Sequence, residues 1–228
     1  MNGRNNVMLE DDGSDQIYRA LITGRLSGED LSARKLGSFL GRTTGAVYHR
    51  WGSLDGLLFV VSQRGFAELG KRVSLIWEET RDLAECAAAY VEFGLDQPAL
   101  YVLMFEHRFD WTSLRRTGVF DRVTPGSQLL AGVVCVLEES GSATAVADTR
   151  LLMAGLHGVV SFAASGRMNT GELTATDRSV ALASARDLAL RLGPTPARPQ
   201  RKTQPKSPKE TAKPSRTKTP PPKNRARR

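Results

Sequence analysis

LSARKLGSFLGRTTGAVYHRWGSLDGLL, residues 31–58, is the stretch that decides the fold. Ser32 has a side chain that can cap the start of a first helix, because its hydroxyl can accept a hydrogen bond from an amide one turn later. The apolar and small residues that follow recur with helical spacing and define one buried face, formed by Leu36, Gly37 and Leu40. This half of the stretch therefore predicts a short amphipathic helix.

A tight turn and a second short helix follow. Gly41 permits the turn, because glycine adopts left-handed backbone angles without a steric penalty. Thr43 is placed to cap the second helix, with Val47 facing inward. The positions left to face outward are Thr44, Ala46, Tyr48, His49 and Arg50. Small and hydroxyl side chains at the start of such a helix allow close approach to the major groove of DNA, so the pattern predicts a helix-turn-helix.

This stretch resembles the DNA-binding unit of the TetR family of bacterial one-component regulators. That unit runs Leu-Thr-Val-Arg-Glu-Ile-Ala, Gly-Val-Ser, Gly-Thr-Leu-Tyr-Arg-Tyr-Phe and Ser-Lys-Glu-Asp-Leu-Leu, and the chain aligns with it without a gap. The positions that match in identity or type are Leu31, Ser32, Arg34, Leu36, Gly41, Gly45, Tyr48, Trp51, Ser53, Leu57 and Leu58. The resemblance implies a three-helix head that binds DNA and a helical body that binds a ligand and dimerises.

Three positions depart from the family pattern. Arg42 replaces an apolar turn residue and Arg50 replaces an aromatic one, so both add positive charge on the expected DNA side. Leu54 stands where a lysine commonly contacts phosphate, and that contact is therefore not expected here.

The remaining pattern predicts an all-α chain in four parts. Residues 1–13 are expected to be disordered, 14–72 to form the head, 73–193 to form the helical effector-binding and dimerisation domain, and 194–228 to form a disordered tail. The first helix is expected from Ser14, a candidate cap, to about Gly24, and a long helix from Ser53 to beyond Ile76. A polar connection is expected over 111–124, and Thr174 is a candidate cap for the last helix. The other expected helices cover 81–95, 98–109, 128–139, 148–167 and 174–192.

Gly65 and Gly70 are unusual inside the long helix that begins near Ser53, because each costs about 1 kcal/mol relative to alanine. They indicate either a bend that lets the head move or close packing against the first helix.

The body also resembles one TetR subgroup, which is named for a Trp-His-Gly motif. Residues 90–105 read YVEFGLDQPALYVLMF, and residues 154–158 read AGLHG, with leucine in place of the tryptophan. In the family, the last two body helices are the usual dimer interface. The alternative is that they close the core of a monomer.

The basic charge of the chain belongs to its last 35 residues. Of 32 basic and 24 acidic residues, 12 basic and one acidic lie in 194–228, so residues 1–193 carry 20 basic and 23 acidic residues and a net charge of −3. The segment also holds nine of the eleven prolines. Such a tail is expected to bind DNA phosphates without reading sequence, although an anionic membrane surface or a merely solvated end remains open.

No composition feature indicates an enzyme, a metal site, a cofactor or a membrane protein. The histidines are His49, His107 and His157, each on a different expected helix, and they share no ligand spacing. Cys86 and Cys135 lie in apolar helical patterns and are expected to be buried, reduced thiols. The start lacks a signal-peptide pattern and no apolar run reaches the ~18–20 residues of a membrane span, so a bacterial cytoplasm, with association to the nucleoid, is expected.

We therefore expect a homodimeric repressor that is released from an inverted-repeat operator by a small-molecule ligand. Its expected partners are double-stranded DNA and this unidentified effector. Base contacts are expected from Thr44, Ala46 and His49, and phosphate contacts from Ser32, Arg42, Thr43, Tyr48 and Arg50. The candidate effector-pocket residues are Met104, Phe105, Trp111, Met153, His157 and Phe162, although His157 could equally be a core histidine. The alternative function is an architectural protein that coats DNA through its basic tail.

Overall fold

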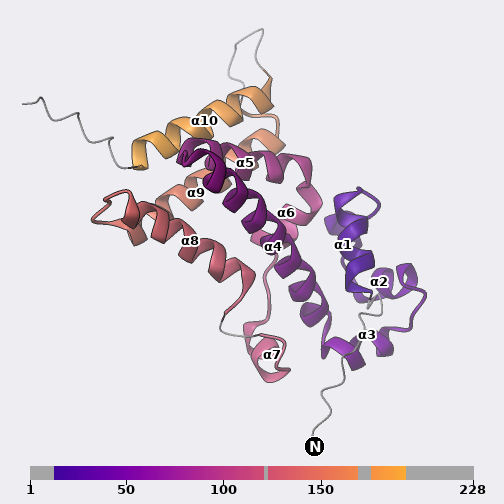
Figure 1. Cartoon of the computed structure of the whole chain (residues 1–228). Helices are drawn as coiled ribbons and strands as arrows, with labels where there is room; N and C mark the ends of the chain where they lie inside the picture. The colour runs from indigo at the N-terminus through magenta and orange to yellow at the C-terminus, as the bar shows by residue number, and fades with distance from the viewer. Residues whose placement is uncertain (1–12, 121–122, 169–175, 194–228) are drawn as a thin grey trace, which may run out of the picture. The chain divides into compact units, whose positions relative to one another are not determined.

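The computed structural model describes residues 13–120, 123–168 and 176–193, and all regular structure within these ranges is helical (Figure 1). The elements are α1 (Ser14–Ile22), η1 (Gly28–Asp30), α2 (Ala33–Phe39), α3 (Thr44–Trp51), α4 (Leu54–Thr80), α5 (Leu83–Asp96), α6 (Pro98–Phe105), α7 (Trp111–Arg116), α8 (Pro125–Glu139), α9 (Ala145–Ala164) and α10 (Asp177–Leu192). The predicted all-α fold is confirmed. The segments expected to be disordered, 1–13 apart from Gly13 and 194–228, lie outside the described residues.

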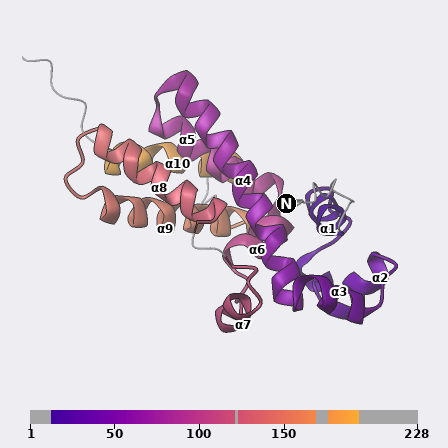
Figure 2. The same cartoon turned by 60° about the horizontal axis from the view of Figure 1, so that its bottom comes forward.

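α4 is the central element of the described chain (Figures 1 and 2). It contacts α1 and α3 on the side of the head, and α5, α6, α7 and α8 on the side of the body. One hydrophobic core runs along it, from Ile17 in α1 to Ala189 in α10. The expected boundary between head and body near residue 72 falls inside this continuous helix. A displacement of α4 would therefore change its contacts with both the head and the body.

The body is closed by α5, α9 and α10, which pack against one another. Arg186 of α10 forms a bidentate pair with Glu85 of α5, at 2.8 and 3.0 Å. Arg178 bonds to Asp96 at 2.8 Å and to Glu92 at 3.0 Å, and Arg72 of α4 also pairs with Glu92. These pairs join helices that are far apart in the sequence.

Several expected boundaries need correction. Ser14 does not cap α1: the cap position is Gly13, with φ +82°, and Ser14 is buried in the first turn. The connection over 111–124 contains α7, because Leu114 buries its side chain completely. The cap of α10 is Thr176, whose hydroxyl accepts from Ser179 N, while Thr174 lies outside the described residues.

The two glycines of α4 have different surroundings. A Cβ on Gly65 would lie 2.4 Å from Met104 Sδ, so Gly65 allows close packing, but against α6 and not against the first helix. A Cβ on Gly70 would meet nothing within 4 Å. Close packing against α6 therefore accounts for glycine at position 65. It does not account for glycine at position 70.

Candidate functional site

The turn between α2 and α3 is built as the sequence predicts. The Ser32 hydroxyl accepts from Lys35 N at 3.4 Å and caps α2. Leu36 and Gly37 form the buried face of α2. Gly41 has φ +61°, in the region that favours glycine, and Arg42 N donates to Gly37 O at 2.9 Å. The chain therefore reverses within a few residues and starts α3 at Thr44.

The outer surface of this unit carries the polar residues expected to contact DNA. Ser32, Arg42, Thr43, His49 and Arg50 are all exposed. The Arg50 guanidinium also lies over the Trp51 ring, 5.5 Å from its centroid. The side chains of three other predicted contacts, Thr44, Ala46 and Tyr48, lie outside the described residues. All eight DNA contacts remain predictions.

α3 is joined tightly to the start of α4. Trp51, the last residue of α3, is 5% exposed and anchors the helix in the core. Gly52 turns the chain with φ +71°, and the Ser53 hydroxyl accepts from Gly56 N at 2.9 Å to cap α4. A Cβ on Gly56 would lie 2.0 Å from the Trp51 carbonyl oxygen. Only glycine therefore fits at this junction, and α3 is held in a fixed direction relative to α4.

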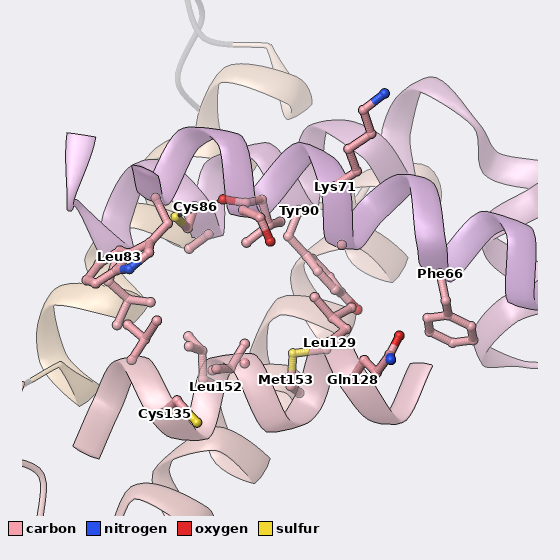
Figure 3. A pocket seen from close by; sticks show the side chains of 18 of the residues that line it. Phe66, Lys71, Leu83, Cys86, Tyr90, Gln128, Leu129, Cys135, Leu152 and Met153 are labelled. Atoms are coloured by element: carbon pink, nitrogen blue, oxygen red, sulfur yellow. Dashed lines mark hydrogen bonds between the residues drawn. The ribbon is translucent and has the colours of Figure 1, made fainter. Parts of the chain in front are cut away.

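The body contains an apolar cavity of about 550 Å³ between α4, α5, α8 and α9. Figure 3 shows Leu83, Cys86 and Tyr90 on one side of the opening and Leu129, Cys135 and Met153 on the other. Phe66 lies at one end, and Lys71 points away from the cavity. The charged residues among its lining are Lys71, Glu78, Arg81 and Glu139. A mostly apolar hollow with few polar groups is typical of small-molecule sites.

A second cavity of about 290 Å³ lies between the first half of α4, the end of α6, α7 and the start of α8. Its walls are strongly aromatic: they include Phe59, Phe66, Phe105, Phe109, Trp111 and Phe120. Phe59 packs on Phe109, Trp111 and Phe120 with ring centroids 5.6–5.9 Å apart. This cluster holds α7 against α4.

The predicted effector residues are divided between these places. Met153 lines the larger cavity, and Met104, Phe105 and Trp111 line the smaller one. His157 lines neither: its Nδ1 lies 3.0 Å from Tyr101 Oη, so it is a partnered histidine of the core edge. Phe162 lies on the surface of α9, 57% exposed. It therefore faces solvent in the described chain.

A chain of hydroxyl groups connects the larger cavity to His157. Tyr90, which lines the cavity, has its Oη 3.1 Å from Tyr101 Oη, and Tyr101 in turn reaches His157. Burial is the largest cause that raises the pKa of both tyrosines above the usual value. The two hydroxyls are therefore neutral hydrogen-bonding groups at any physiological pH.

A short clasp attaches the start of α4 to the loop after α6. Asp55 Oδ2 accepts from Asp110 N at 2.7 Å, and Asp55 Oδ1 lies 3.2 Å from His107 Nε2. Asp55 stands in the first turn of α4, four residues after Trp51. The clasp thus connects the loop beside the smaller cavity to the junction that orients α3.

The two cysteines both line the larger cavity but differ in exposure. Cys86 is buried as predicted, and burial followed by the charges of Asp82 and Glu85 raises its pKa to about 11. Cys135 is exposed, so the prediction of burial was wrong for it. The helix buries Leu137, two residues later, and leaves Cys135 exposed.

Sequence reasoning missed most of the cavity walls and the clasp. Trp77, Leu83, Tyr90 and Leu129 have ordinary core spacing, and Asp55 is an ordinary first-turn acid. A partial signal was the density of aromatic residues over 105–120, which is high for a connection.

The described residues hold no group of three or more metal-ligating side chains close enough to share an ion. Within the same residues, no helix combines the length and the hydropathy required to cross a bilayer.

Residues 83–186 match the model of the tetracyclin repressor-like C-terminal domain. This part of the chain is therefore similar to the C-terminal domain of TetR-type repressors. The family match covers α5 to most of α10, the part that holds the larger cavity.

Two solved structures show the same fold. A protein of unknown function from Rhodococcus sp. RHA1 has a TM-score of 0.54 at 19% identity, over 84% of this chain and 100% of that one. The candidate regulatory protein SCO4313 has a TM-score of 0.54 at 15% identity, over 79% of this chain and 98% of that one. No curated protein sequence matches this chain.

Proposed function

We propose that this protein is a TetR-type repressor that binds an inverted-repeat operator as a homodimer and is released by a small-molecule ligand in its body. The observation that carries this proposal is the exposed end of α3, with His49 and Arg50, which is joined to α4 by a turn at Gly52 and by a contact of Trp51 that leaves room only for glycine at Gly56. The proposal also places the protein in the cytoplasm, on the nucleoid, and gives it no enzymatic activity.

The DNA contacts follow from the placement of side chains on the head. Thr44, Ala46 and His49 would contact base edges in the major groove, while Ser32, Arg42, Thr43, Tyr48 and Arg50 would contact phosphates. Exposure of Ser32, Arg42, Thr43, His49 and Arg50 supports this division. Lys35 is a less suitable phosphate contact, because it pairs with Asp30 at 3.0 Å.

The dimer interface would lie on α9 and α10. Leu151 and Phe162 are 59% and 57% exposed and lie three helical turns apart on one face of α9, with exposed Ala154 between them. Leu190 of α10 is 69% exposed. Large apolar side chains with small ones between them suit helix packing between two copies. We assign Phe162 to this face, since it lines neither cavity.

The dimer is tested by Leu151→Glu, with Leu75→Glu as the matched control. Leu75 is 57% exposed on α4, so both variants place a charge at a similarly exposed leucine. Light scattering after size exclusion should give a dimer for the control and a monomer for Leu151→Glu at the same concentration. A dimer for both variants would remove this interface from the proposal.

Ligand release would act through α4. The larger cavity, with Met153 in its wall, would hold the effector, and the smaller cavity, with Met104, Phe105 and Trp111, adjoins the clasp at Asp55. A ligand that binds better when α4 is displaced would favour a spacing of the two heads that does not match the half-sites.

The alternative is a DNA-coating protein in which the tail dominates and the head has little sequence preference. Deletion of 194–228 should lower the affinity for all DNA and flatten its salt dependence under both functions. His49→Ala should change sequence preference only if α3 reads bases. The deciding experiment is competition: random-sequence DNA that displaces an operator probe as well as the operator does would establish the coating function instead.

A further inference from the structure

The two cavities meet at a single side chain. Phe66 is the one residue that lines both the larger and the smaller cavity in the described chain. Figure 3 shows it at the end of the larger cavity, beside Gln128. Its ring packs edge-on against Phe105, with centroids 5.1 Å apart, and is only partly buried. One phenyl ring therefore separates two apolar spaces that lie along the same face of α4.

The ring is held by weak contacts and can turn aside. A Cβ on Gly126 would lie 3.3 Å from the Phe66 ring, so glycine at the start of α8 leaves just enough room for the ring in its present place. Rotation of one partly buried side chain between staggered positions needs no movement of the helices. When the ring turns, the larger cavity would continue into the smaller one.

The polarity of the walls then orients an occupant. The smaller cavity is lined by aromatic rings, small polar groups and His107, with no carboxylate or Lys and Arg side chain. The larger cavity carries Lys71, Glu78, Arg81 and Glu139 among its lining. Lys71 points away from the cavity, so the charges that an occupant could reach are those of Glu78, Arg81 and Glu139. An occupant would therefore have its polar end in the larger cavity and an apolar end in the smaller one.

We propose that the effector is a molecule with a straight acyl or alkyl chain, whose end passes Phe66 and fills the aromatic cavity beside α7. A flexible chain can follow an opening the size of one side chain, and its methylenes suit the aromatic walls of the smaller cavity. The regulatory role of this ligand rests on the proposed function. Binding of its acyl or alkyl chain depends only on the two cavities and is measured without DNA.

The test is a series of straight-chain carboxylates from hexanoate to tetradecanoate, measured by isothermal titration calorimetry on the full chain. Each buried methylene adds about fourfold in affinity. In the unaltered protein the affinity should rise beyond the length that fills the larger cavity. Alcohols of the same lengths should show the same rise, because the wall charges have both signs.

Two filling variants locate the chain. Ser62→Leu enlarges a fully buried side chain that lines only the smaller cavity, and should stop the rise at the length that fills the larger one. Gly132→Leu enlarges a residue that lines only the larger cavity and should weaken all lengths. Phe66→Ala, which removes the partition, should strengthen long chains relative to short ones, and it remains informative if Ser62→Leu fails to fold.

The proposal is overturned if the affinity of the unaltered protein stops rising at short lengths, or if folded Ser62→Leu or Phe66→Ala has the same length profile as the unaltered protein. Operator binding of the ligand-free protein is measured in parallel. A flat length profile with intact operator binding refutes the chain ligand alone. Loss of operator selectivity with a rising profile refutes the proposed function and leaves the chain site standing.

Discussion

The head and the body of this protein are stabilised in different ways. In the head, the contacts that set the helices join near neighbours: Ser27 N donates to Asp30 at 2.9 Å, and Lys35 N donates to Ser32. In the body, they join residues far apart, such as Arg186 with Glu85, 101 positions earlier, and Tyr101 with His157, 56 positions later. The α2–α3 unit of the head is therefore specified mainly by local sequence, whereas these pairs of the body form only in the fold.

The junction between the two parts gives the largest expected effect. Gly56→Ala would bring a Cβ to 2.0 Å from the Trp51 carbonyl oxygen, and backbone cannot move aside as a side chain can. We expect a loss of about 3 kcal/mol in the free energy of unfolding, measured in urea, because overpacking of this kind costs about 1–3 kcal/mol and sometimes more. Operator affinity should fall with it.

Gly70→Ala is the matched control for that substitution in the same helix. A Cβ there meets nothing within 4 Å, so the variant should be up to about 1 kcal/mol more stable than the unaltered protein. If both variants have the same stability, the close contact at Gly56 does not constrain the junction.

The hydroxyl chain of the body gives the next effect. Tyr101→Phe removes the group that contacts both Tyr90 Oη and His157 Nδ1, and leaves two polar atoms at the core without that partner. We expect the free energy of unfolding, measured in urea or by heating, to fall by about 2 kcal/mol. Ser32→Ala, which removes a local cap at the exposed start of α2, should cost about 1 kcal/mol. If Ser32→Ala lowers the free energy of unfolding more than Tyr101→Phe does, the local cap of the head matters more than the long-range hydrogen bonds of the body.

The smallest effect is a difference in reactivity with no change in stability. Cys135 is exposed and should be alkylated by iodoacetamide at pH 8, whereas Cys86 is buried and its pKa is raised to about 11. Since the thiolate is the reactive form, Cys86 should begin to react only as the pH approaches 11. Peptide mass spectrometry would measure the two rates; equal rates at pH 8 would mean that Cys86 is accessible.

The same contrast explains what could be predicted from the sequence. Ser32 and Gly41 act through residues a few positions away, and their roles as cap and turn were predicted correctly. The role of Phe66 could not be predicted, because it depends on Phe105 and Gly126 reaching it from two other helices. Ser14 was assigned wrongly as a cap because its burial against the core is a tertiary contact.

The candidate effector residues Met153 and Phe162 of α9 differ in their surroundings for the same reason. Met153 lines the larger cavity, because it lies in an apolar helix next to Leu152, and its contact with an effector stays a prediction. Phe162, in the same helix, faces solvent. Periodicity identifies the faces of a helix, but it does not distinguish a face toward the core from a face toward a second copy of the chain.

The most direct test of the central claim is selection of bound DNA from a random-sequence library, by the full chain and by its His49→Ala variant. If α3 reads bases in both half-sites, the unaltered protein should select a compact inverted repeat, and the variant should show a changed preference at the same base pair of each half-site. Recovery of unselected sequences by both proteins, with affinity that depends only on salt, would contradict it.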